Sequence, residues 1–461
     1  MSLLERVRVP HTLVLLLLVM AAALAATWML PQGSFTTTTN EHGRDVVVAG
    51  TFEIHEERVW LSPLALLTAV PRALGDAQEI IFFVFLIGGS LAIVRATGAI
   101  DALLGRVLES FGHRSHWLVI GGMAVFSAAS GTFGMAEEYI PFVLILIALC
   151  AAMRMDAVAA VGIMVCGYGI GYGVAPLNPF TVLVAQDVAG LAPGSGWPLR
   201  VAIFGPFLLI GIHHVLRYAR RVQNDPSTSL VADLPAAQHE ARRDYPRMTW
   251  RHRLVLLTML ATLVLLVIGV ALWGWYLVEL SALFFGMGLI VALIARVAPS
   301  ESARIFCDGA AAMTTTALLI GFARAIALLL EDGQVLHTVV HGLAAPLTAV
   351  GAEASAVGML IIQTVLNFFI PSGSGQALAT MPIMVPIGDL VGVSRQVAVL
   401  AYQFGDGFAN MIVPTNAILM GILGIAGIPY DRWLRFIVPL MGKLLVAGAV
   451  TLVGAVLLGY R

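Results

Sequence analysis

Charged residues are scarce in this chain. Asp, Glu, Lys and Arg make up only 11% of its 461 residues, whereas 59% are hydrophobic. So little charge cannot cover a water-soluble protein of this size, and the composition therefore predicts a polytopic protein in a lipid bilayer. The net charge of −1 lacks the positive excess that nucleic-acid binding requires, so we expect no nucleic-acid partner.

Cysteine is also rare, and the usual catalytic motifs are missing. The three cysteines, Cys150, Cys166 and Cys307, lie in apolar runs without C-x-x-C spacing, which indicates neither a disulfide framework nor a metal site. The chain contains no Gly-x-Ser-x-Gly and no His-Glu-x-x-His. We therefore expect no enzyme and no cofactor, with a membrane-embedded hydrolase or transferase and a solute-sensing receptor as remote alternatives.

Two stretches of the chain repeat each other. Gly167-Tyr168-Gly169 precedes Pro176-Leu177-Asn178 at the same spacing at which Gly405-Asp406-Gly407 precedes Pro414-Thr415-Asn416. Glycine, proline and asparagine inside apolar runs predict interrupted helices, with breaks at residues 167–178 and 405–416. Freed backbone groups are tolerated in a membrane only inside protein or a water-filled cavity. Such breaks in matching halves of a transporter point to a solute site.

The repeat extends outward in register. Leu86-Ile87-Gly88 corresponds to Leu319-Ile320-Gly321, and Ser130-Gly131-Thr132 corresponds to Ser372-Gly373-Ser374. The alternative is that Gly and Pro are simply frequent in membrane helices, but an ordered set of anchors is poorly explained by that. We predict an all-α fold built from two repeats.

The placement of arginine predicts the organisation along the chain. Residues 1–31 hold a first transmembrane helix with a cytoplasmic N-terminus, since Arg6 and Arg8 precede it. The remaining segments are predicted as follows: an external polar segment with a β-hairpin (32–63), repeat 1 (64–217), an arginine-rich cytoplasmic linker (218–253), extra helices (254–297) and repeat 2 (298–461).

Each repeat is predicted to contain a re-entrant helical hairpin and a broken helix, in opposite orientations. The stretch 117–153 starts and ends beside cytoplasmic arginines, so it must turn back within the membrane, at 130–134. The stretch 353–391 enters from outside and turns at 371–375. Broken helices follow at 157–191 and 397–428.

Hydroxyl and amide side chains gather at these helix ends. Unpaired N–H groups suit a carboxylate, whereas carbonyl and hydroxyl oxygens suit Na⁺. The candidate residues for a solute site are Ser130, Gly131, Thr132, Asn178, Ser372, Gly373, Ser374, Asn410, Thr415 and Asn416, with Na⁺ placed near Ser130, Thr132, Asn178, Ser374 and Asn416. Ordinary capping of the helix ends is the alternative.

Three acidic residues accompany these ends. Glu137 and Glu138 follow the first turn, and Asp406 lies in the second broken helix. A carboxylate inside a membrane is costly and indicates function, although one of the two glutamates reaching water is an alternative. No Lys or Arg is expected inside the membrane nearby, which favours a positively charged solute or a proton.

The chain resembles the YfcC-type transporters, which are related to the anaerobic C4-dicarboxylate carriers within the ion transporter superfamily. The resemblance covers nearly the whole chain. Its most specific motifs are Gly134-Met135-Ala136-Glu137-Glu138, Asn178-Pro179-Phe180 with Ala185-Gln186, and Tyr402-Gln403-Phe404-Gly405-Asp406-Gly407-Phe408 with Asn410 and Pro414-Thr415-Asn416.

This resemblance implies a homodimer in which a transport domain moves as an elevator against a scaffold. It implies either basic amino acids, often by arginine/ornithine exchange, or dicarboxylates as substrates. Sodium-coupled relatives carry Ser-Asn-Thr at the hairpin tips, whereas the tips here are Ser-Gly-Thr and Ser-Gly-Ser.

The sequence thus predicts a multi-pass secondary active transporter of the bacterial inner membrane. The expected solute is a small charged metabolite, most simply a basic amino acid. A C4-dicarboxylate or other carboxylate is the alternative, and Na⁺ or H⁺ is the candidate coupling ion.

Overall fold

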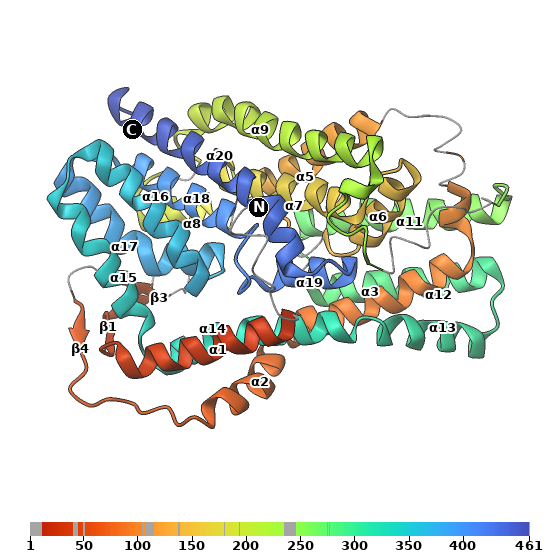
Figure 1. Cartoon of the computed structure of the whole chain (residues 1–461), viewed down its shortest axis with the longest axis horizontal. Coiled ribbons are helices and arrows are strands. Elements are labelled where there is room, and N and C mark those ends of the chain that lie inside the picture. Colours follow the sequence, from red (N-terminus) through yellow and green to blue (C-terminus); the bar gives the residue numbers. More distant parts are fainter. Residues whose placement is uncertain are drawn as a thin grey trace.

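Helices make up nearly all of the described chain in a computed structural model of the protein (Figure 1). The structure describes residues 12–39, 45–48, 51–103, 106, 115–136, 139–178, 180–192, 194–234, 246–273, 275 and 277–460. Helices satisfy their own backbone groups, which apolar surroundings require. Within these ranges, five helices are long and apolar enough to cross a membrane: Gln78–Ala96, Trp197–Asn224, Leu277–Ala295, Ala352–Phe369 and Tyr430–Leu457.

The first described elements are α1 (Thr12–Met29) and two short strand pairs. Strand β1 (Gly33–Ser34) pairs antiparallel with β4 (Glu53–Ile54), and β2 (Thr37–Thr39) pairs with β3 (Asp45–Val47). In the first pair Gly33 lies opposite Ile54. The segment predicted as one hairpin thus contains two strand pairs, and β1 packs near α15.

The helices of the two halves follow one another in matching order. The first half contains α2 (Ala65–Asp76), α3 (Gln78–Ala96), α5 (Ser115–Phe133), α6 (Phe142–Ala152), α7 (Ala157–Gly173), α8 (Val182–Val188), α9 (Trp197–Asn224) and η3 (Pro226–Thr228). Helices α11 (Trp250–Trp273) and α12 (Leu277–Ala295) come between. The second half contains α13 (Pro299–Ala311), α14 (Thr314–Asp332), α15 (Leu336–Ala344), η4 (Ala345–Ala349), α16 (Ala352–Phe369), α17 (Gly373–Val391), α18 (Arg395–Ala409), α19 (Ala417–Ala426) and α20 (Tyr430–Leu457).

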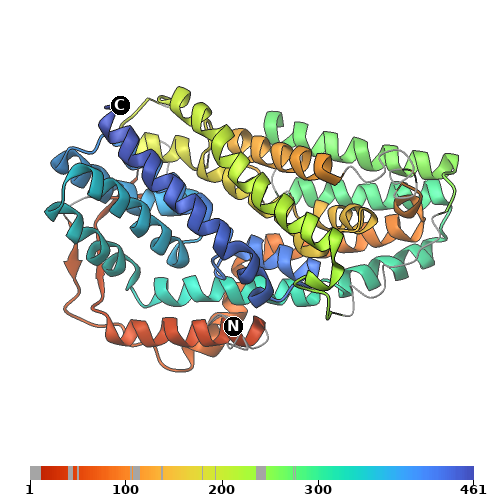
Figure 2. The ribbon, with the colours of Figure 1, turned by 45° about the horizontal axis from the view of Figure 1, so that its top comes forward.

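Helices at corresponding places make corresponding contacts. Helix α5 packs along α7 as α16 packs along α18, and the pairs α2–α14 and α3–α13 join the halves. The long helices α9 and α20 each carry one internal proline, Pro206 and Pro439. Figures 1 and 2 show α9 and α20 on one side of the molecule and α1 with α14 on the other.

The breaks in the two interrupted helices lie later in the chain than predicted. Helix α7 continues through Gly167–Gly169 to Gly173, and α18 continues through Gly405–Gly407 to Ala409. These glycines do not break the helices. Because they lack side chains, they allow another part of the backbone to pack closely against the helix. A Cβ atom on Gly407 would overlap the backbone of Gly173 and lie 2.8 Å from the carbonyl carbon of Tyr172. The broken helices therefore cross in backbone contact.

Helix α9 also extends beyond the predicted boundary at residue 217. It continues to Asn224 because no proline or glycine occurs between residue 217 and Pro226. Asp225 then accepts a hydrogen bond from Ser227 N at 3.1 Å and starts η3. The predicted linker consequently begins with helix.

Candidate functional site

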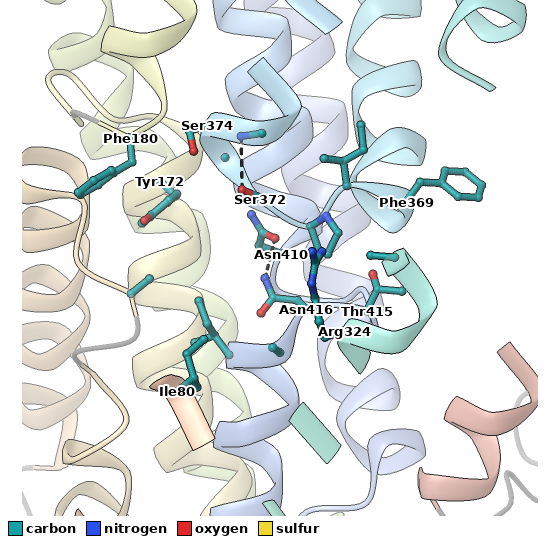
Figure 3. A pocket seen from close by; sticks show the side chains of 18 of the residues that line it. Ile80, Tyr172, Phe180, Arg324, Phe369, Ser372, Ser374, Asn410, Thr415 and Asn416 are labelled. Carbon is teal, nitrogen blue, oxygen red and sulfur yellow. Dashed lines mark hydrogen bonds between the residues drawn. The ribbon is translucent and has the colours of Figure 1, made fainter. Parts of the chain in front are cut away.

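A cavity of about 510 Å³ lies at the tip of the second helical pair, α16 and α17 (Figure 3). Its walls come from several elements. The tip contributes Phe369 to Gly375, the break between α18 and α19 contributes Asn410, Thr415 and Asn416, and the first half contributes Ile80, Gly134, Ala136, Tyr168, Tyr172 and Phe180. Helix α14 adds Arg324, Ala327 and Glu331. The cavity therefore joins both halves.

The start of α17 presents backbone groups to this cavity. Ser372 is the N-cap residue, and its Oγ accepts a hydrogen bond from Gly375 N at 3.3 Å. The Gly373 carbonyl accepts one from the Tyr402 hydroxyl at 2.6 Å, which ties the tip to α18. The first N–H groups of a helix attract anions, so this turn suits a carboxylate.

The break between α18 and α19 is held by side-chain hydrogen bonds. Asn416 caps α19, accepting from Leu419 N at 2.9 Å, and its Nδ2 donates to Asn410 Oδ1 at 2.7 Å. Thr415 Oγ1 donates to the Phe368 carbonyl at 2.8 Å. Asn416 therefore both caps α19 and lines the cavity.

Asp406 lies behind the cavity and is fully buried. Its Oδ1 accepts hydrogen bonds from Asn367 Nδ2 at 2.9 Å and Asn410 Nδ2 at 3.2 Å. Asn367 also donates to Gln376 Oε1 at 3.1 Å, so amide side chains connect Asp406 with the interior of the α16–α17 pair. Asn410 connects it with the cavity.

At the turn of the first helical pair, α5 and α6, polar side chains form hydrogen bonds with one another and with the local backbone. Ser130 Oγ donates to the Met135 carbonyl at 2.7 Å and lies 2.8 Å from the Tyr139 hydroxyl. Asn178 Nδ2 donates to the Ser130 carbonyl at 2.9 Å, while its Oδ1 accepts from the N–H groups of Phe180 and Thr181. Among the described residues, these hydrogen bonds tie the end of α5 to Met135 and Tyr139 and to the break between α7 and α8.

The predicted site residues therefore divide into two groups. Ser372, Gly373, Ser374, Asn410, Thr415 and Asn416 line the cavity, whereas Ser130, Gly131, Thr132 and Asn178 do not. Thr132 is exposed and donates to the Ala128 carbonyl of its own helix at 2.7 Å. Of the residues proposed for Na⁺, only Ser374 and Asn416 reach the cavity. Glu137 and Glu138 lie outside the described residues.

Arg324 was missed by the sequence analysis. This arginine of α14 lines the cavity, donates to Asp76 and lies 3.2 Å from Glu331 Oε1. The sequence analysis expected no Lys or Arg inside the membrane near the three acidic residues and did not anticipate this arginine in the cavity wall. The signal was present in the sequence, since Arg324 interrupts the apolar run 317–330 and a charge in such a run indicates function.

Arg200 is a second arginine that the sequence analysis passed over. It is fully buried in α9 and donates to the side-chain Oε1 atoms of Gln403 and Gln396, both in α18. Gln403 Nε2 in turn donates to the Ala175 carbonyl at 2.8 Å, beyond the end of α7. Through the neutral side-chain amide of Gln403, Arg200 thus stabilises the backbone just after α7 in the first half.

Comparison with known proteins places the whole chain in one family. Residues 9–457 match the family DcuC, described as C4-dicarboxylate anaerobic carrier. An Escherichia coli K12 protein named "Putative basic amino acid antiporter YfcC" is 35% identical, over 99% of this chain and 98% of that protein. An uncharacterized Haemophilus influenzae protein is 25% identical, over 96% of each chain.

Two solved structures are similar over most of their length. One is the YdaH transporter of Alcanivorax borkumensis, with 15% identity, a TM-score of 0.44 and coverage of 98% of this chain and 99% of that one. The other is MtrF of Neisseria gonorrhoeae, with 18% identity, a TM-score of 0.41 and coverage of 97% and 95%. The family match and the E. coli relative show that the chain belongs to the DcuC family of membrane transporters.

Proposed function

We propose that this protein is a secondary active transporter that exchanges basic amino acids across the bacterial inner membrane, with its N-terminus in the cytoplasm. The observation that carries the proposal is the cavity where the tip of α16–α17 meets the break between α18 and α19. Helix ends meeting inside a membrane form solute sites in transporters of this kind. The name of the E. coli relative supports the choice of substrate.

The cavity offers complementary groups for an amino acid. The first turn of α17, from Ser372 to Gly375, suits the α-carboxylate, because helix N-termini attract anions. Glu331, which also pairs with Arg324, and the oxygens of Asn410 and Asn416 suit the cationic end. Glu137 and Glu138, which lie outside the described residues, remain predicted partners of that end from the sequence.

The proposed mechanism is an elevator built from two inverted repeats in a homodimer. The matching contacts α5–α7 and α16–α18 support the repeats. The α2–α14 and α3–α13 pairs join the two halves, and we assign them to the scaffold, against which α19 packs through α14. The homodimer and the moving transport domain rest on the family resemblance.

A C4-dicarboxylate is the second candidate substrate, with Na⁺ or H⁺ as its coupling ion. Arg324 favours it, because a guanidinium group in the cavity suits a carboxylate. The description of the family favours it as well. However, Arg324 already pairs with Asp76 and Glu331, so much of its charge is compensated.

Proteoliposomes distinguish the two candidates. Vesicles containing the purified protein and loaded with ornithine are expected to take up labelled arginine, whereas vesicles loaded with buffer or succinate are not. Uptake of fumarate or succinate without arginine exchange would contradict the proposal and support the second candidate. A thermal-shift panel with both solute classes provides an independent check, since a ligand stabilises the state that it binds.

A further inference from the structure

Arg324 pairs with two carboxylates, of which one lies in the cavity wall and the other does not. This arginine of α14 donates through Nε to Asp76, the last residue of α2, and through Nη1 to Glu331 Oε1 at 3.2 Å. Arg324 and Glu331 line the cavity (Figure 3), whereas Asp76 is not among the described residues that line it. The two partners of Arg324 are therefore not equivalent toward a bound solute.

The charges of this group do not cancel. Asp76 and Glu331 share a single guanidinium group, that of Arg324, so two ionised carboxylates and one cation leave one excess negative charge. The neighbouring ion pair between Arg72 and Asp332, which also joins α2 to α14, is neutral by itself, with 2.5 Å between Nη1 and Oδ2. A solute with a cationic group would supply the charge that the cavity wall lacks.

Partial exposure allows the partners of Arg324 to exchange. The exposed fractions of the Arg324, Asp76 and Glu331 side chains are 35%, 47% and 44%. Ion pairs that are open to solvent contribute little free energy, so a competing cation can replace one partner. The cationic end of a solute can thus displace Arg324 from Glu331. Asp76 can keep the displaced guanidinium, because it binds a different nitrogen atom and lies outside the described wall of the cavity.

We propose that Asp76 is a positioning residue, which holds Arg324 while the cationic end of the solute binds Glu331. In the empty cavity Arg324 then acts as a tethered competitor of the solute for Glu331. The part of its charge that Asp76 compensates determines how strongly Arg324 competes. This role rests on the proposed function, because it requires a solute with a cationic group.

Initial rates of arginine uptake into ornithine-loaded proteoliposomes test this role. Asp76→Asn is expected to raise the KM for arginine roughly 3- to 5-fold at a nearly unchanged maximal rate, because Arg324 then pairs with Glu331 alone. Asp76→Glu is expected to keep the low KM. In the Arg324→Gln background, Asp76→Asn is expected to change the KM less than about 2-fold. Asp332→Asn is the matched control and is expected to leave the KM unchanged, because it breaks only the ion pair with Arg72.

Thermal unfolding of the purified full-length protein tests the sharing of Arg324 without any solute. Glu331→Gln is expected to lower the Tm more in the Asp76→Asn background than in the wild type, because Arg324 pairs more strongly with Glu331 when it has no second carboxylate. In the Arg324→Gln background this difference is expected to vanish. The double-mutant comparison thus isolates the competition between the two carboxylates from their separate effects on folding.

The outcomes separate this role of Asp76 from the proposed function. An unchanged KM in Asp76→Asn, or an equal rise in Asp332→Asn, would overturn the role and leave arginine exchange by the wild type standing. A rise that persists in the Arg324→Gln background would mean that Asp76 acts on the solute without Arg324, and would also overturn it. Absence of arginine exchange by the wild type would contradict the proposed function. The Tm comparison would still decide whether Arg324 is shared, and equal Tm losses in both backgrounds would show that it is not.

Discussion

The two helical pairs share a backbone arrangement but differ in chemistry. The turn of the first pair is closed by Ser130, Tyr139 and Asn178, which satisfy one another and the local backbone. The turn of the second pair lines the cavity with the hydroxyl side chains of Ser372 and Ser374, whereas the described residues of the first turn that line it are Gly134 and Ala136. The neighbouring broken helices show the same contrast, with Tyr168 and Tyr172 in α7 where α18 carries Asp406 and Asn410.

This difference indicates that the two halves contribute different chemical groups to the cavity. The first half contributes mainly aromatic side chains to the described wall of the cavity, Tyr168, Tyr172 and Phe180. The second half contributes hydroxyl and amide groups, and behind them the buried carboxylate. We therefore expect solute and ion binding to depend on the second half, and stability to depend on both.

We expect the largest effect of a substitution where the two broken helices, α7 and α18, cross. Gly407→Ala would place a Cβ atom against the backbone of Gly173, which cannot move aside as a side chain can. We expect a loss of about 3 kcal/mol of stability or more, and poor recovery of folded protein. Thermal unfolding measures the effect. Gly442→Ala in α20 is the control, because a Cβ there meets nothing within 4 Å, and equal behaviour of the two variants would contradict the crossing.

Replacing Asp406 tests whether the buried charge belongs to transport or to the fold. Asp406→Asn keeps the size of the side chain but removes the charge that no cationic side chain compensates in the described residues. We expect transport to fall to background while the protein stays folded, since burying an unpaired charge costs several kcal/mol. Uptake and thermal unfolding are measured together, with Asp389→Asn as the exposed control. Undiminished uptake by Asp406→Asn would remove the carboxylate from the mechanism.

Substitutions in the ion pair between Arg324 and Glu331 distinguish the two candidate classes of substrate. Glu331→Gln is expected to raise the KM for arginine roughly 10-fold, since a hydrogen bond to a charged group contributes about 1.5 kcal/mol or more. Arg324→Gln is expected to lower that KM, because it frees Glu331. Initial rates of uptake report both effects. The opposite pattern, with succinate uptake lost in Arg324→Gln, would indicate a dicarboxylate carrier.

Asn178 and Asn416 occupy equivalent positions and allow a smaller test. Asn178→Ala breaks the bonds to Ser130, Phe180 and Thr181, so we expect a stability loss of about 1–2 kcal/mol with an unchanged KM. Asn416→Ala removes a cap and a group that lines the cavity, so the KM is expected to rise as well. Thermal unfolding and uptake distinguish the two variants. An equal change in KM for both would contradict the division between the halves.

Much of the fold was predictable from local signals. Glycine, serine and proline mark the ends of α5, α16 and α17, because they suit turns and caps wherever they occur. The Gly-x-Gly motifs misled, since a helical glycine looks the same in sequence whether it breaks a helix or admits a neighbouring backbone. Gly407 is of the second kind.

The site was predictable only where its residues belong to the repeat itself. Ser372, Ser374 and Asn416 follow from it, whereas Arg324 reaches the site through the packing of α14, a helix distant in sequence. The repeat also suggested equal roles for its two copies. Whether a turn closes on itself, as at Ser130, depends on partners such as Tyr139 that the motif does not contain.

The most direct test of whether the solute binds at the second turn alone is to measure how the solute protects engineered cysteines from labelling. Cys150, Cys166 and Cys307 are first replaced by serine or alanine, and Ser374→Cys and Thr132→Cys are then made separately. Both variants are labelled with a membrane-impermeant maleimide in proteoliposomes, with and without arginine. We predict that arginine slows labelling at position 374 and leaves position 132 unchanged. Protection at position 132 without protection at position 374 would contradict the account.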